Sequence, residues 1–157
     1  YFVYDMYIQK MPNHKKIEGT YLGKEHGTKI TQSAELEPLV QDTCDQREIT
    51  ISCPNPCDKK TILVVIGSNK RTFVLDENAS GEGSTYIGTA DPSSSAYENA
   101  DLLVATAKLY FNKECDKISI IKSIAYTDKK DSAGDKVTVW ITSHLKAHKD
   151  KKPCACH

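Results

Sequence analysis

Arginine is scarce in this 157-residue sequence, and long apolar runs are absent. Arg47 and Arg71 are the only arginines among 21 basic residues, and 21 acidic residues bring the formal net charge to zero. Nucleic-acid-binding surfaces use a basic excess and rely on arginine for bidentate contacts, so we expect no nucleic-acid partner. No apolar stretch approaches the ~20 residues of a transmembrane helix, so we expect no membrane span.

Catalytic motifs are missing as well. The five histidines lie in polar, lysine-rich surroundings, and none adjoins a nucleophile motif such as Gly-x-Ser-x-Gly. They are His14, His26, His144, His148 and His157. The acidic residues between positions 72 and 107 lie in loop-like sequence without an apolar pocket that would raise a carboxyl pKa. We therefore expect that the protein is not an enzyme and uses no cofactor.

Cysteine, in contrast, is plentiful. The six cysteines are Cys44, Cys53, Cys57, Cys115, Cys154 and Cys156. An even number, with one pair bracketing a Pro-Asn-Pro segment, is typical of a disulfide framework and an oxidising compartment. The sequence thus predicts a secreted, extracellular protein. Its start at Tyr1 fits a mature form without its signal peptide, and an excised fragment is the alternative.

The spacing of the cysteines narrows their pairing. Cys154 and Cys156 are too near each other in the chain for a comfortable mutual bond. We expect at least one of them to bond to Cys53 or Cys57, which would close the tail onto the Pro-rich segment. A further candidate pair is Cys44 with Cys115.

A zinc site is the rival interpretation of these cysteines. The Cys53-x3-Cys57 segment and the terminal Cys154-x-Cys156-His157 would supply enough soft ligands for tetrahedral zinc. Their spacing matches no common zinc motif, and the secreted character favours disulfides. We therefore expect no metal at these residues.

A polar loop near position 78 carries two further motifs. Asp76-x-Asn78-x-Ser80 resembles the start of an EF-hand loop, but Ile87 stands where that loop requires a glutamate. A calcium-binding EF-hand is therefore excluded. Asn78 also begins an Asn-Ala-Ser sequon, so we expect an N-linked glycan on this loop.

Apolar and polar residues alternate over much of the chain, which predicts β-strands. The expected strands cover residues 48–53, 60–67, 71–75, 85–88, 118–126 and 136–142. The polar segment 127–135 predicts a hairpin between the last two strands. These features favour one mainly β domain over residues 1–157, an antiparallel β-sandwich of immunoglobulin-like or similar type that is stabilised by disulfides. Residues 144–157 are expected to form a basic, cysteine-containing tail.

Residues 95–111 fit two conformations. A Ser-x-x-Glu capping box at Ser95 predicts a short helix near 95–105. Alternation from Leu103 to Phe111 instead predicts a strand. We expect a short helix that passes into a strand.

The N-terminal segment suggests a function. Residues 1–10 read as a terminal strand with large side chains on both faces, and the expected interface residues are Phe2, Tyr4, Met6 and Ile8. Such a strand can complete its own sheet or add to the sheet edge of a neighbouring copy, which produces filaments when repeated head to tail. An acidic stretch at 72–107 and a basic one at 108–152 suit contacts of this kind.

We therefore expect a secreted, self-assembling structural subunit that contacts copies of itself or another extracellular protein. The alternative is a monomeric secreted module that binds a glycan, a small ligand or a foreign protein. An aromatic face for a glycan would draw on four residues, Tyr86, Tyr97, Tyr126 and Trp140.

Overall fold

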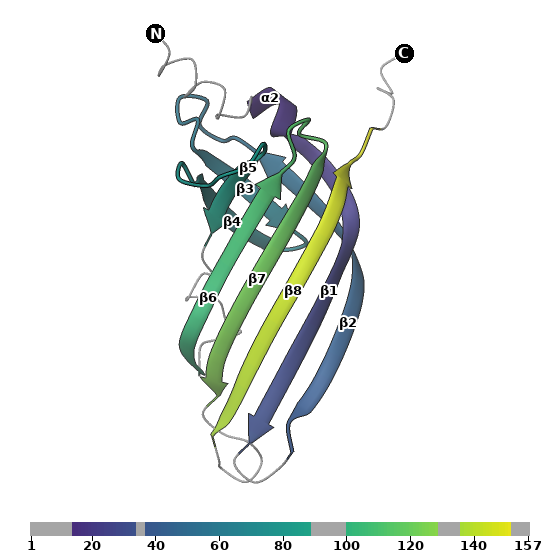
Figure 1. The fold of residues 1–157 in the computed structure, drawn as a ribbon, viewed down its shortest axis with the longest axis vertical. Coiled ribbons are helices and arrows are strands. Elements are labelled where there is room, and N and C mark those ends of the chain that lie inside the picture. Colours follow the sequence, from purple (N-terminus) through teal and green to yellow (C-terminus); the bar gives the residue numbers. More distant parts are fainter. Residues whose placement is uncertain (1–13, 34–36, 89–99, 129–135, 152–157) are drawn as a thin grey trace.

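The computed structural model describes residues 14–33, 37–88, 100–128 and 136–151. One helical turn, α2 (His14–Ile17), precedes eight strands. The strands are β1 (Gly19–Ser33), β2 (Leu39–Ser52), β3 (Thr61–Ile66), β4 (Asn69–Leu75), β5 (Ser84–Gly88), β6 (Ala100–Phe111), β7 (Lys117–Asp128) and β8 (Val137–Lys149). Each strand pairs antiparallel with the next in sequence, and β8 pairs with β1 to close a barrel (Figure 1).

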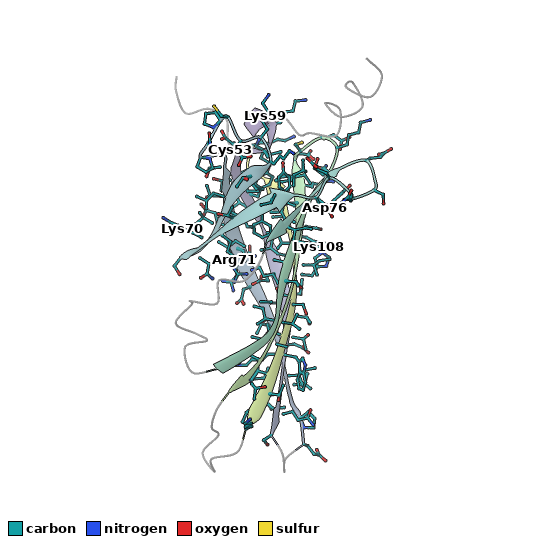
Figure 2. All side chains as sticks on the ribbon, turned by 90° about the vertical axis from the view of Figure 1, so that its left-hand side faces the viewer. Cys53, Lys59, Lys70, Arg71, Asp76 and Lys108 are labelled. Atoms are coloured by element: carbon teal, nitrogen blue, oxygen red, sulfur yellow. The ribbon has the colours of Figure 1, made fainter. Side chains whose placement is uncertain are left out.

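The barrel is closed over only part of its height. β3 pairs with β2 only over Ile49–Ser52, and β5 pairs with β6 only over Ala107–Phe111. Beyond those segments β6, β7, β8, β1 and β2 continue as a curved open sheet (Figure 1). Figure 2 shows Cys53 and Lys59 at the closed end near α2, and Lys70 where the short strands stop.

The apolar core fills the closed end. Residues at alternate strand positions point inward and are buried, as the period of two for strands requires. The largest fully buried side chains there include Tyr21, Ile49, Ile62, Phe73, Tyr86, Leu109, Phe111, Ile120 and Leu145. Phe111 lies edge-on to Tyr86 and Tyr21, with ring centroids 5.6 and 6.2 Å apart.

The helical turn α2 covers this end of the core. Ile17 is fully buried beneath it, and the Tyr21 hydroxyl donates to the carbonyl oxygens of Ile17 at 2.8 Å and Cys115 at 3.2 Å. The Tyr86 hydroxyl is buried without a hydrogen-bond partner in the described part of the chain. Burial raises the pKa of both phenols, so both stay protonated.

The mainly β, antiparallel prediction is confirmed, but the sandwich is wrong because the strands form a single closed ring. β1 was not expected, since its two interior glycines and its charged residues give weak β propensity. β1 pairs with both β2 and β8, so it joins the two ends of the sheet. No helix in the described ranges is long and apolar enough to cross a membrane.

Two local expectations also change. The helix near 95–105 is wrong from residue 100 onward, because β6 places Ala105, Ala107, Leu109 and Phe111 on one face opposite β7. Positions 95–99 lie outside the described residues. Residues 144–149 are not tail but a continuation of β8, where Leu145 and Ala147 are buried in the core. The antiparallel pairing of the last two strands is confirmed, with Asp128 opposite Val137.

Gly23 lies where β1 and β8 approach closely. A Cβ atom there would collide with the carbonyl oxygen of Lys146 and with Ala147. We expect Gly23→Ala to lower the free energy of unfolding by about 2 kcal/mol or more, because the two strands must move apart. Urea denaturation checks this. Lys24→Ala, at the exposed neighbouring position, should change the free energy of unfolding by less than about 0.5 kcal/mol. Equal destabilisation by the two variants would contradict the close approach.

Candidate functional site

A charged cluster lies on the concave face of the sheet, where the closed end and its apolar core stop. Alternation places Glu25 on the same face of β1 as Tyr21, Arg47 on that of Ile49 in β2, and Lys122 on that of Ile120 in β7. Each charged residue lies at an inward-facing position beyond the last apolar core residue on its strand.

Glu25 is the centre of the cluster. Its Oε1 accepts a hydrogen bond from Arg47 Nε at 3.2 Å, and its Oε2 accepts from Lys122 Nζ at 3.3 Å and Ser143 Oγ at 3.4 Å. The Glu25 and Lys122 side chains are only 13% and 19% exposed, so solvent screens this pair weakly. Arg47 is 41% exposed and also reaches Asp45 at 3.5 Å.

Opposing effects act on the Glu25 carboxyl. Burial raises its pKa, but Lys122 and Arg47 lower it more through charge and hydrogen bonding, so the pKa lies below its usual value. Glu25 is therefore ionised at neutral pH and holds the two cations in place.

The cluster is richer in donors than in acceptors. A guanidinium has five N–H donors and an ammonium three, whereas neither accepts a hydrogen bond. Glu25 receives one donor from Lys122 and one from Arg47, and Asp45 receives a second from Arg47. The arrangement suits a ligand with a negatively charged or strongly accepting oxygen.

A cavity of about 330 Å³ opens beside this cluster. It lies where the closed wall ends, under the β3–β4 turn, because Ile66 is the last residue of β3 and pairs with Ile49. Its lining residues are Glu25, Gln46, Arg47, Glu48, Ile66, Gly67, Ser68, Asn69 and Lys122. The cavity thus combines a charged wall with the rim of the barrel.

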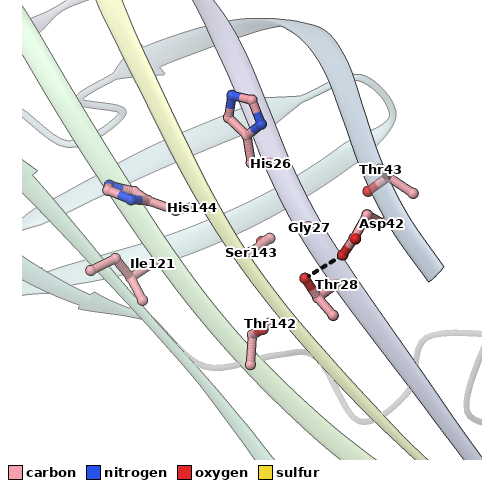
Figure 3. Close-up of a pocket in the computed structure, with 9 residues that line it drawn as sticks. All are labelled: His26, Gly27, Thr28, Asp42, Thr43, Ile121, Thr142, Ser143 and His144. Atoms are coloured by element: carbon pink, nitrogen blue, oxygen red, sulfur yellow. Dashed lines mark hydrogen bonds between the residues drawn. The ribbon is translucent and has the colours of Figure 1, made fainter. Parts of the chain in front are cut away.

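A second hollow, of about 390 Å³, lies on the outer face of β1, β2, β7 and β8 (Figure 3). His26 is opposite His144 of β8 and Cys44 of β2, and its Nε2 lies 4.0 Å from the Cys44 sulfur. Thr28 donates to Asp42 at 2.9 Å. No set of three or more His, Cys, Asp or Glu side chains within the described ranges could hold a metal ion.

The expected disulfide framework is only partly covered by the described ranges. Cys44, Cys53, Cys57 and Cys115 are free thiols, so the pair of Cys44 with Cys115 is wrong, and so is the expected bond from the C-terminal cysteines to Cys53 or Cys57. Cys44 is on the outer face of β2, whereas Cys115 is buried in the β6–β7 turn at the closed end. Two further cysteines, Cys154 and Cys156, lie outside the described residues.

Other expected site residues are spread apart. Asn78 is exposed in the β4–β5 loop, where its backbone N–H donates to Asp76 Oδ1 at 3.1 Å, and its glycosylation stays a prediction. Tyr86 is in the core and Trp140 is on the outside, so they do not share an aromatic face. The remaining expected residues, Phe2, Tyr4, Met6, Ile8, Tyr97 and His157, lie outside the described ranges.

The cluster of Glu25, Arg47 and Lys122 was not predicted from the sequence. One signal was present: Lys122 interrupts the apolar positions Ile118, Ile120 and Ile124 on one face of a strand. Its partners lie in strand segments that the sequence did not predict.

Comparisons with protein-family models, curated proteins and solved structures gave no match.

Removal of the Glu25 charge should change the pH dependence of stability. Because its folded-state pKa is lowered, Glu25 stabilises the fold above its unfolded pKa, and this contribution disappears as pH falls through the folded pKa. We expect Glu25→Gln to cost about 1–3 kcal/mol at pH 7, with the difference from wild type shrinking below about pH 4. Urea denaturation across pH tests this. Glu37→Gln, at an exposed position, serves as the control, and a constant difference for Glu25→Gln would contradict the ion pairing.

The thiols should differ in reactivity. Burial and the nearby Glu18 carboxylate raise the pKa of Cys53 to about 11, and burial also raises the pKa of Cys115. At pH 8 we expect iodoacetamide to modify the exposed Cys44 and Cys57 first, as peptide mass spectrometry can follow. The Cys53 rate should rise about tenfold per pH unit up to pH 10, and a rate already level at pH 8 would contradict the raised pKa.

Proposed function

We propose that the protein is a non-enzymatic binding module that holds a small ligand with a carboxylate in the cavity beside Arg47 and Lys122. The supporting observation is a pair of cations around one carboxylate, next to a cavity of about 330 Å³ at the barrel rim. Cavities of this size are typical of small-molecule sites, in which a few placed polar groups orient the ligand. Secretion, expected from the cysteine content, belongs to the same proposal.

A carboxylate suits the hydrogen bonding of this site. Glu48 in the lining and Asp45 on Arg47 offset the positive charge of the cluster, so directed hydrogen bonds from Arg47 and Lys122, rather than an excess of charge, would hold the carboxylate. Arg47 can turn a second edge of its guanidinium toward the ligand while Nε stays on Glu25, in the two-point geometry that carboxylates prefer. Glu25 Oε2 accepts hydrogen bonds from both Lys122 Nζ and Ser143 Oγ. These bonds hold the Lys122 ammonium in place before a ligand binds.

The self-assembling subunit stays a second prediction. Its expected contact residues lie within positions 1–10, outside the described residues. Among the described strands, the closed end leaves no unpaired edge, but β2 is unpaired on one side farther down. The binding module is preferred because its charged residues and cavity lie together within the described structure.

Titration with hexanoate, followed by amide chemical shifts, tests the binding proposal. Hexanamide, with the same chain and no charge, is the matched control ligand. We expect hexanoate alone to shift resonances of β1, β2 and the β3–β4 turn near the cavity. Arg47→Gln should weaken hexanoate binding by about 10- to 100-fold, because hydrogen bonds to charged groups contribute about 1.5–3 kcal/mol.

The control variant is Lys24→Met, which removes a cation from the exposed face of β1 and should leave hexanoate binding unchanged. Equal binding of hexanoate and hexanamide, or undiminished binding by a folded Arg47→Gln variant, would rule out the carboxylate site.

A further inference from the structure

The first part of β2 is an unpaired sheet edge. From Leu39 to Glu48 it pairs with β1 on one side, and no described strand pairs with its other side, because β3 begins pairing only at Ile49. Every residue from Leu39 to Glu48 is exposed. A row of backbone N–H and C=O groups on such an edge is a template for another strand.

We propose that this edge pairs antiparallel with the same edge of a second copy, with Cys44 opposite Cys44 at the two-fold axis. A symmetric dimer uses the same patch on both subunits, so the edge must be complementary to itself. The two open sheets would then join through β2 into one continuous sheet.

Symmetry limits the registers of this contact. A two-fold axis between adjacent antiparallel strands is perpendicular to the sheet, so the concave faces of both copies lie on the same side. Directly opposed residues also share a face, so even-numbered residues of β2 oppose even-numbered ones. One residue must therefore lie opposite itself.

Charge removes most of the remaining registers, because like charges placed directly opposite each other are destabilising. With Asp42 or Asp45 at the axis, two carboxylates would oppose each other. With Gln46 at the axis, the edge from Leu39 to Thr43 would find no partner within the unpaired segment, and with Gln41 there the edge from Cys44 to Glu48 would find none. A centre nearer either end leaves still more of the edge unpaired, so Thr43 and Cys44 remain as the central residue.

The register centred on Cys44 gives the better polar pairs. It places Asp42 opposite Gln46, Gln41 opposite Arg47 and Thr43 opposite Asp45, so three charged side chains meet hydrogen-bonding groups, and only Glu48 faces an apolar residue, Val40. The register centred on Thr43 gives one such pair, Gln41 with Asp45, and places Arg47 opposite Leu39 and Asp42 opposite Cys44.

Gln46 offers a pair of matched variants at one exposed position. Gln46→Asp would place a carboxylate opposite Asp42 at two symmetric points, and Gln46→Lys would place a cation there. We expect sedimentation velocity to show dimers of the wild type, about 2- to 30-fold weaker association of Gln46→Asp, and stronger association of Gln46→Lys. Circular dichroism verifies that each variant is folded.

Covalent trapping tests the axis directly. Oxidised glutathione accepts two electrons and two protons from two Cys44 thiols, forming one Cys44–Cys44 disulfide and two molecules of reduced glutathione. Directly opposed Cα atoms in antiparallel strands lie about 4.5 or 5.5 Å apart, within the span of a disulfide. The exposed Cys57 is an internal control for random oxidation.

We expect non-reducing peptide mapping of the dimer to show the Cys44–Cys44 link in preference to any link through Cys57. Three results would overturn the proposal: a monomer at all concentrations, cross-links distributed equally between Cys44 and Cys57, or the same change in association for Gln46→Asp and Gln46→Lys. The last result would indicate the register in which position 46 opposes Val40.

Discussion

The closure of β8 onto β1 is the contact on which the rest of this structure depends. Without this contact the chain would form an open meander. The core residues of β1 and β8 would then no longer pack against each other. Closure requires the backbones to approach closely at Gly23, where a side chain would collide with Lys146 and Ala147. Glycine, which weakens most strands, thus occupies a position that allows β8 to close onto β1.

Unequal strand lengths then determine where chemistry can occur. β3, β4 and β5 are short, so the ring encloses an apolar core at only one end. Just beyond that core, inward positions are no longer fully screened from water. A carboxylate and two cations are stable there because they pair with one another, whereas a lone charge at the same depth would be costly. The cavity and the charged cluster therefore share one origin.

The sequence predicted most strands, because alternation around Ile49, Phe73, Ile120 and Val139 reports burial on one face. It did not predict the ring, since closure depends on β1, whose glycines and charges resemble a loop. It also missed the site. Glu25, Arg47 and Lys122 are 22 to 97 positions apart in the chain, and only the pairing of four strands brings them together.

Because the strands differ in length, the two ends of the molecule also differ in their resistance to local unfolding. The closed end can open only if the aromatic core is breached, so its amides should exchange with solvent near the global unfolding limit. The first part of β2 is held by hydrogen bonds to β1 and has no buried side chain from Leu39 to Glu48, so it can detach while the ring remains intact. The protein thus combines a rigid cap with a strand segment whose fluctuations cost little free energy.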